Sequence, residues 1–164
     1  MIGKISYYYY IRASFLNDKN HKSMIISQLS VFMENKSGRL AGVLEALAKE
    51  NHRILALSVA DTTDFGILRL LVSEPEKART VLKNQLFTVN VTEVIAVMVP
   101  DQAKEYAGVL KSLSDLEISV EYTYAFSSGG KSIIILQCSD NKKAIDALKS
   151  NGLELLCTED LYRM

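Results

Sequence analysis

Residues 28–47 read QLSVFMENKSGRLAGVLEAL, and residues 94–113 read VIAVMVPDQAKEYAGVLKSL. The two stretches share one apolar pattern, and the likeness continues without a gap through residues 28–93 and 94–159 at a constant offset of 66 positions. A repeat this long that occurs only twice indicates a duplicated small domain, because a solenoid needs at least three stacked units. The matched pairs are Val31 and Val97, Val43 and Val109, Leu44 and Leu110, Leu47 and Leu113, Ile67 and Ile133, Leu70 and Leu136, Lys77 and Lys143, Ala78 and Ala144, and Leu82 and Leu148.

Size and charge limit what the duplicated chain can do. Units this short bury little of their surface alone, so we expect them to pack against each other or against a second subunit. Lysine plus arginine equals aspartate plus glutamate at 19 each, and no net field therefore favours nucleic acid or an anionic membrane. No apolar run approaches the length that spans a bilayer. We expect neither a nucleic-acid partner nor a membrane partner.

The two cysteines, Cys138 and Cys157, fall in apolar, strand-like segments and form no metal-binding spacing. Buried reduced thiols in a cytoplasmic protein are the expected state, and a disulfide stays open as the alternative. Residues 1–27 lie outside the repeat, and the polar stretch 17–23 has no periodicity. We expect residues 1–27 to be an N-terminal extension that is disordered or a mis-annotated start, with Met24 as a natural start.

Each repeat predicts the element order β-α-β-β-α-β, the ferredoxin-like arrangement. In the first copy, apolar residues spaced i, i+3, i+4 and i+7 predict a helix that ends near Asn51, which tolerates a left-handed cap. Ser73, Pro75 and Glu76 predict the start of a second helix with a capping box. The expected strands are 29–33, 54–60, 66–72 and 87–91, with a turn at 61–64; the first helix is striped by Leu40, Val43, Leu44 and Leu47, and the second by Ala78, Val81 and Leu82.

The second copy predicts the same order. A helix begins near Tyr106, a turn contains Gly129 and Gly130, and Ser139 is expected to cap the last helix. The predicted strands are 94–99, 118–126, 132–138 and 153–157; the helices are striped by Tyr106, Val109, Leu110 and Leu113, and by Ala144, Ala147 and Leu148. The fold class is therefore α+β, with domains at 28–93 and 94–164 whose antiparallel sheet carries helices on one face.

Catalytic chemistry has little support in this sequence. His21 lies in the polar extension and His52 at the end of a predicted helix, and neither has a nucleophile with an orienting partner beside it. No glycine-rich phosphate loop, zinc spacing or metalloprotease helix is present. We predict that the chain is not an enzyme and uses no cofactor and no metal.

The loop from Asn35 to Leu40 joins the first strand to the first helix. The unpaired N–H groups of a helix start bind anions well, including the carboxylate of an amino acid. Gly38 lets the backbone approach a ligand closely, and the Asn35 amide offers both a donor and an acceptor. The alternative is a plain strand-to-helix turn in which Ser37 caps the helix and Gly38 makes the bend.

Residues 28–159, about four-fifths of the chain, resemble a tandem pair of ACT domains, the small ligand-binding regulatory modules of amino-acid metabolism. Residues 28–40 are similar to the opening strand of that family and its Asn/Asp-x-Pro-Gly-x-Leu loop. Residues 57–62 and 64–69 resemble the second and third strands of stand-alone ACT pairs, as do 94–101 and 118–126 in the second copy. The resemblance implies a protein that binds an amino acid at an interface between ACT units.

Carried over to this sequence, the resemblance implies that Asn35 meets the amino group of the ligand and that the backbone of Ser37 to Leu40 meets its carboxylate. The opposite wall would come from the second strand of a neighbouring unit, where three aromatic residues share one strand face. Ordinary packing between sheets is the alternative for these three. The expected ligand-binding residues are Asn35, Lys36, Ser37, Gly38, Arg39, Leu40, Tyr122, Tyr124 and Phe126.

This sequence departs from the family pattern in both loops. Ser37 stands where the family has proline, and residues 101–106 of the second copy lack both the proline and the glycine. Lys104 replaces the equivalent of Gly38, where it would crowd a ligand bound by backbone. We therefore expect one working site per chain, on the first loop.

The favoured function is a regulatory sensor that binds a small free amino acid and acts in trans on a partner protein or an enzyme. We expect a homodimer, because joining sheets covers edges that would otherwise be exposed. The ligand would act as a switch by binding more tightly to one packing of the two units than to the other. The alternative is a structural or protein-interaction module that has kept the fold and lost the ligand.

Overall fold

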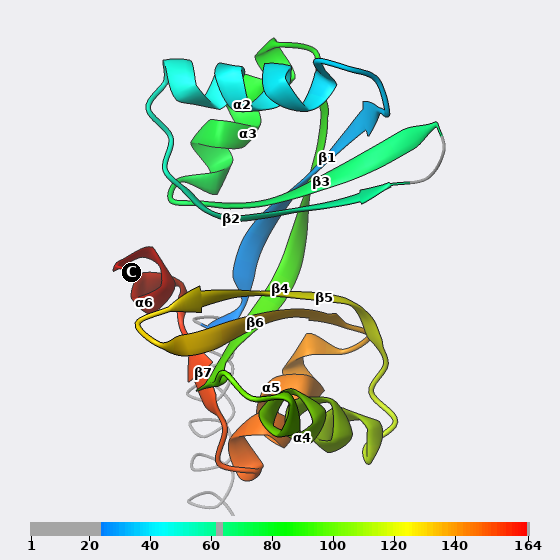
Figure 1. Ribbon diagram of the computed structural model, residues 1–164, viewed down its shortest axis with the longest axis vertical. Helices are drawn as coiled ribbons and strands as arrows, with labels where there is room; N and C mark the ends of the chain where they lie inside the picture. The colour runs from blue at the N-terminus through cyan, green and yellow to red at the C-terminus, as the bar shows by residue number, and fades with distance from the viewer. Residues whose placement is uncertain (1–23, 62–63, 164) are drawn as a thin grey trace, which may run out of the picture. The chain divides into compact units, whose positions relative to one another are not determined.

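A computed structural model describes residues 24–61 and 64–163, so the expectations for residues 1–23 and for the tip of the turn at 62–63 lie outside the described residues. The chain divides into two compact units (Figure 1). The first unit is Ser27–Val94, and the second contains the described residues from Ile95 onward together with those before Ser27.

The first unit is an antiparallel sheet with two helices on one face (Figure 1). Its strand order is β2-β3-β1-β4, in which β1 pairs antiparallel with β3, and β3 with β2. Its elements are β1 (Ile26–Glu34), α2 (Arg39–Lys49), β2 (Ile54–Asp61), β3 (Phe65–Val72), α3 (Pro75–Asn84) and the first part of β4 (Thr88–Pro100).

The second unit repeats this arrangement with the strand order β5-β6-β4-β7. Its elements are the second part of β4, α4 (Ala103–Ser114), β5 (Val120–Ser128), β6 (Lys131–Cys138), α5 (Asn141–Ser150) and β7 (Glu154–Leu156), followed by α6 (Thr158–Arg163). A register shift occurs at corresponding places in both edge strands, after Ile54 and after Val120. The predicted fold, two ferredoxin-like units with antiparallel strands and helices on one face, is confirmed.

The cores of the two units are built from corresponding residues. Leu47 and Leu113 lie on the inner faces of α2 and α4, and both are fully buried. Leu70 and Leu136 hold corresponding places on β3 and β6, again fully buried. The 66-residue offset therefore preserves burial as well as residue type. The buried apolar face of α2 and of α4 is narrower than the sequence predicted, because Leu40 and Leu110 at its edge are exposed.

The strand β4 corrects one prediction. The sequence predicted a strand at 87–91 and a separate strand at 94–99, but the structure has one strand, Thr88–Pro100, that passes from the first unit into the second. Residues 92 and 93 contain no glycine or proline, so nothing in their backbone interrupts the extended chain. The helix α6 was not predicted, and the closing strand of the second copy is shorter than expected.

Two predicted helix caps are wrong, and so is the alternative that placed Ser37 as the cap of the first helix. The cap of α2 is Gly38 and not Ser37, and the cap of α3 is Glu74 without the predicted Ser73 and Glu76 bonds. Asp140, not Ser139, caps α5, and its carboxylate accepts from the Lys143 amide at 3.0 Å. Adjacent Ser and Asp residues compete for such positions, and backbone dihedrals decide between them.

The predicted helix end at Asn51 is confirmed, with φ 56°, and the amides that follow it close the last turn of α2. The ends of α3, α4 and α5 are closed in the same way around Leu86, Glu117 and Gly152. These positions require a left-handed backbone, which costs a residue with a side chain about 1–2 kcal/mol. Leu86 is therefore an unusual occupant, and it is 94% exposed.

Candidate functional site

The loop between β1 and α2 is shaped by Gly38, whose φ of 84° lies in the left-handed region that glycine favours. A Cβ atom placed on Gly38 would meet no other atom within 4 Å. The glycine is thus required by the backbone, and the space in front of it is open. Both features suit a loop whose main chain approaches a ligand.

Several amide groups of this loop point to no acceptor. The backbone N–H of Asn35 donates to the backbone carbonyl of Asp64 at 2.9 Å, and the backbone N–H of Arg39 donates to the carbonyl of Lys36 at 3.2 Å. Among the described residues, the amides of Ser37, Gly38 and Leu40 have no hydrogen-bond partner. A cluster of N–H groups at a helix start favours an anion, because the helix dipole adds to their partial positive charge.

The loop is flanked by one acidic and two basic side chains. The Glu34 carboxylate lies 3.0 Å from Lys36 Nζ and 3.3 Å from an Arg39 guanidinium nitrogen. Hydrogen bonds from Lys36 and then Arg39 lower the pKa of Glu34 below its ordinary value. These groups are largely exposed, so their contribution to stability is small. Their effect is to place a compensated set of charges beside the loop.

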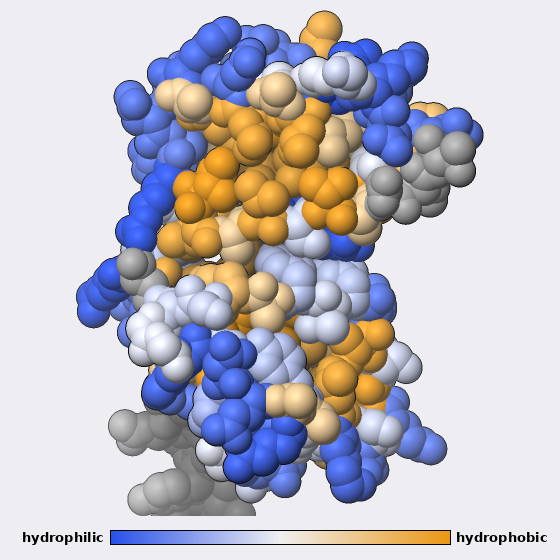
Figure 2. All heavy atoms as spheres, in the orientation of Figure 1, coloured by the Kyte–Doolittle hydropathy of each residue, from blue (hydrophilic) through white to orange (hydrophobic). Residues whose placement is uncertain are grey.

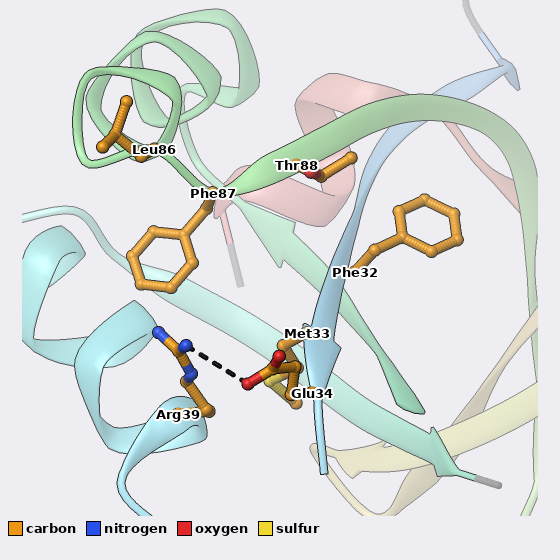
Figure 3. A pocket seen from close by; sticks show the side chains of 7 residues that line it. All are labelled: Phe32, Met33, Glu34, Arg39, Leu86, Phe87 and Thr88. Atoms are coloured by element: carbon orange, nitrogen blue, oxygen red, sulfur yellow. Dashed lines mark hydrogen bonds and ion pairs between the residues drawn. The ribbon is translucent and has the colours of Figure 1, made fainter. Parts of the chain in front are cut away.

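A pocket of about 210 Å³ lies next to this loop in the first unit (Figure 3). The Phe87 ring and the Arg39 side chain point toward one another, and the Arg39–Glu34 ion pair lies below them, whereas Phe32 points away on the other side of β1. We call this cavity the first-unit pocket. It is lined by Phe32, Met33, Glu34, Arg39, Leu86, Phe87 and Thr88.

The six loop residues expected to bind ligand, Asn35 to Leu40, are brought together by the strand-to-helix connection. The three aromatic residues expected opposite them, Tyr122, Tyr124 and Phe126, share one half-buried face of β5 in the second unit. In register they lie opposite Gln137, Ile135 and Ile133 of β6. That this face lies opposite the first-unit loop stays a prediction.

The corresponding loop of the second unit has a different geometry. Gln102 precedes α4 in an extended conformation with φ −141°, and no left-handed glycine is present there. The side chain of Asp101 accepts a hydrogen bond from Ser132 Oγ at 3.0 Å. Lys104 lies in the first turn of α4, paired with Glu105 at 3.5 Å. The space that is open before Gly38 therefore has a charged side chain at its counterpart.

Sequence reasoning missed part of the site. Glu34, Met33, Phe87 and Thr88 were not singled out, although they join Arg39 around the first-unit pocket. The spacing of Glu34, Lys36 and Arg39 was a signal for the charge cluster. Phe87 and Thr88 gave no such signal in the sequence, because only the strand pairing brings the start of β4 to the end of β1.

Within the part of the chain that the structure describes, the other chemistry-bearing groups do not assemble into a second candidate site. The described ranges 24–61 and 64–163 contain no group of His, Cys, Asp and Glu residues placed to hold a metal ion. Burial, with a smaller effect of the Glu121 charge, raises the pKa of the Cys138 thiol to about 11. Cys157 donates to the Asp160 carboxylate at 2.9 Å. In the same ranges, no helix is both long enough and apolar enough to cross a membrane.

Comparison with known proteins gives a family and a set of similar structures. The family model described as an ACT domain pair matches residues 24–164. No curated protein matches the chain. A crystal structure of a protein from Bacteroides thetaiotaomicron is 42% identical in sequence, with a TM-score of 0.82, and the alignment covers 86% of this chain and 98% of that one.

Two more distant structures share the fold. The regulatory subunit of aspartate kinase from Thermus thermophilus has a TM-score of 0.59 at 13% identity, over 76% of this chain and 91% of that one. The corresponding subunit from Thermus flavus has a TM-score of 0.56 at 13% identity, over 76% and 90%. At such identity the likeness concerns the fold alone.

Proposed function

Because this chain belongs to the ACT domain pair family, we propose that it binds a free amino acid at the loop of its first unit and reports that binding to a partner protein. The observation that carries the proposal is the Gly38 turn with its unpartnered amides. The ligand carboxylate accepts from the amides of Ser37, Gly38 and Leu40, and the Asn35 side chain meets its amino group.

The proposed stoichiometry is one amino acid per chain. The second loop lacks the left-handed glycine, and Lys104 occupies the corresponding position. A lysine side chain at this point excludes a ligand held by backbone amides. The two units then differ in role, with the first as the sensor and the second as its structural counterpart.

We propose regulation in trans for the output. A site made of backbone amides and an exposed ion pair offers no nucleophile with an activating base, so binding and release are its natural chemistry. Ligand binding changes the partner only if it favours one arrangement of the protein over another. An enzyme whose flux depends on the sensed amino acid is the proposed partner.

The edge strand β2 supports a homodimer. Leu57 and Val59 lie on its helix-covered side, opposite Leu70 and Leu68 in register, yet they are 47% and 43% exposed. Figure 2 shows apolar side chains gathered on this part of the first unit, beside β2 and the helices. Residues 54–60 contain no charge and no proline, the devices that normally protect a sheet edge.

Pairing of β2 with β2 of a second copy would cover these side chains. In an antiparallel pair, the start of β2 in one copy lies beside its end in the other. In the second unit, Thr123 and Ala125 stand at the positions that correspond to Leu57 and Val59. The Thr123 hydroxyl donates to the Ile135 carbonyl. The proposed interface therefore belongs to the first unit.

Val59→Lys tests this interface, with Ala125→Lys at the corresponding place in the second unit as its matched control. Light scattering after size-exclusion chromatography should give a dimer mass for the native chain and for Ala125→Lys, and a monomer mass for Val59→Lys. A monomeric native chain, or a dimer that survives Val59→Lys, rejects the interface.

Thermal-shift measurements against the twenty amino acids test the binding function. A ligand at a hundredfold excess over its Kd adds about 2.7 kcal/mol to the free energy of unfolding, which is a shift of several degrees for a chain this size. We expect a small number of amino acids to raise Tm in the native chain and not in Gly38→Val. If none of the twenty amino acids changed Tm, the alternative function, a protein-interaction module that has lost its ligand, would be favoured. The altered second loop is consistent with that alternative.

A further inference from the structure

We propose that the Leu86 side chain of one copy of this chain docks into a groove on the second unit of another copy. The contact joins unlike surfaces, so it is separate from the pairing of β2 with β2. It also stands independently of amino-acid binding. The inference rests on two features that the duplication left in different units, a protruding leucine on the first and an open groove on the second.

The groove lies between α4 and the end of α5 and has a volume of about 420 Å³. Gly108 and Ser112, which are four residues apart on α4, give this wall two small side chains, and Leu116 follows shortly after the helix. Among the described residues, no atom outside the helix's own turn lies within 4 Å of a Cβ placed on Gly108. Clefts that hold ligands measure roughly 300–1,000 Å³, so a leucine side chain has room to enter. We call this cavity the α4–α5 groove.

The polar side chains of the α4–α5 groove are bonded within their own unit. Ser112 Oγ donates to a backbone carbonyl of α4 at 2.9 Å. Ser150 Oγ and the Asn151 side-chain nitrogen donate to one backbone carbonyl of α5, at 2.9 Å and 2.8 Å. Lys111 Nζ pairs with the Asp115 carboxylate at 3.0 Å. Because a polar guest would have to compete with these bonds, the groove favours an apolar guest.

The corresponding place in the first unit is filled. Gly42 is the counterpart of Gly108, and a Cβ placed on Gly42 would lie 3.7 Å from the Cζ atom of Phe87. In the second unit the position of Phe87 is held by Leu153, which is too short to reach Gly108. The substitution of leucine for phenylalanine therefore leaves the space beside Gly108 open in the second unit alone.

The first unit carries the feature that fits this groove. Leu86 is 94% exposed, the largest exposed fraction among the large apolar side chains of the described residues. Its φ is 65°, whereas its counterpart Gly152 has φ 73° and no side chain. Figure 3 shows the Leu86 side chain and the Phe87 ring on opposite sides of the chain. The left-handed backbone opposes a Cβ atom and solvent offers no apolar contact in return, so burial against another copy would supply what the single chain lacks.

Charges beside the two features are complementary. Lys83 lies one turn before Leu86, and Glu117 directly follows Leu116 at the groove; both are exposed. In the part of the chain that the structure describes, neither takes part in an ion pair. Lys149 stands on the α5 side of the groove, so Leu86 would enter with Lys83 turned toward α4 and Glu117. An exposed pair of this kind contributes little energy, and its effect is to orient the contact.

The geometry of the contact determines the assembly. Each copy carries one Leu86 and one α4–α5 groove, so the contact is heterologous and can join copies in sequence. A single side chain covers far less than the roughly 1,200–2,000 Å² that a stable interface buries. The association should therefore be weak and should increase with protein concentration.

Sedimentation equilibrium of the full chain, from micromolar to millimolar concentration, tests the contact. The mass of the native chain should rise above its value at low concentration. Leu86→Asn keeps a residue that tolerates a left-handed backbone and removes the apolar side chain, so it should weaken the association roughly tenfold or more. Leu86→Met, which keeps an apolar side chain, should associate as the native chain does. A native mass that stays constant, or equal association of the Asn and Met variants, would overturn the proposal.

The groove is tested by filling it from within. Gly108→Leu places a side chain in the open space of a helix position with ordinary φ, so the association should be lost while Tm does not fall. Ala107→Leu is the matched control, because Ala107 is exposed on the same helix and does not line the groove. Equal association of these two variants would show that Leu86 does not use the α4–α5 groove.

Charge reversal tests the orientation of the docked leucine. Lys83→Glu should weaken the association, and the double variant Lys83→Glu with Glu117→Lys should restore it, because the exchange returns unlike charges to the contact. A double variant no better than Lys83→Glu would overturn the proposed arrangement. The amino-acid thermal shifts of the native chain do not depend on any of these results, so failure of the contact and failure of the binding function are distinguishable.

Discussion

The two units of this protein have nearly the same interior and different surfaces. Leu47 and Leu113 are equally buried, whereas Gly38 with φ 84° corresponds to Lys104 in a helical turn. On the edge strands, Leu57 of the first unit corresponds to Thr123 of the second. The comparison teaches that duplication kept what the fold requires, and that the differences lie where we propose that one copy binds.

The largest expected effect concerns the shared interior. Leu47→Ala and Leu113→Ala each remove a fully buried side chain from corresponding places, so each should lower the free energy of unfolding by about 2–5 kcal/mol. Urea denaturation monitored by circular dichroism measures both. A large loss in one variant and almost none in the other would show that the two cores are not equivalent.

The next largest effect on stability is expected to differ between the β1–α2 loop and the corresponding loop before α4. Gly38→Val places a β-branched residue at φ 84°, which should cost about 1–2 kcal/mol of stability although no atom obstructs the new side chain. Lys104→Val, in the exposed first turn of α4, should change stability by less than about 0.5 kcal/mol. Equal costs in the same denaturation experiment would mean that Gly38 is not required by its backbone.

A smaller effect of opposite sign is expected at the end of α3. Leu86 has φ 65° and its counterpart Gly152 has φ 73°. Leu86→Gly should raise the free energy of unfolding by about 0.5–1 kcal/mol, because relief of left-handed strain exceeds the added entropy of the unfolded chain. A lower Tm for this variant in calorimetry would show that the exposed Leu86 side chain stabilises the protein through a contact.

The smallest effect is a pH dependence that arises from Glu34, whose counterpart in the second unit is uncharged. Lys36 and Arg39 lower the pKa of Glu34 in the folded protein, whereas the corresponding Pro100 has no charge. The ion pairs of Glu34 therefore stabilise the fold above its ordinary pKa of 4.5, and this contribution is lost as pH falls through the lowered value. The stability difference between the native chain and Glu34→Gln should shrink from pH 7 to pH 3; a constant difference would contradict the assignment.

The sequence predicted the fold because burial leaves a periodic record. The spacing of Val43, Leu44 and Leu47, the apolar strand-length runs around it and their repetition 66 residues later predicted the order of the elements. Helix caps were less predictable, since Ser139 and Asp140 have similar chemistry and only backbone dihedrals choose Asp140. The continuous β4 was missed because a strand shared by two repeats looks in sequence like two strands.

The candidate site was predictable only in part. Gly38 was recognisable because it stands between a predicted strand and an amphipathic helix, and the structure places it in the left-handed region. The first-unit pocket was not, because Phe87 lies more than fifty residues from Glu34 in sequence. A site made by strand pairing is visible only once the pairing is known.

Calorimetric titration of the full chain with the amino acid that gives the largest thermal shift tests the central claim, that one unit binds and the other does not. We predict one ligand per chain for the native protein and for Lys104→Val, and no binding for Gly38→Val. Two ligands per chain, or one ligand that remains bound in Gly38→Val, would contradict the account.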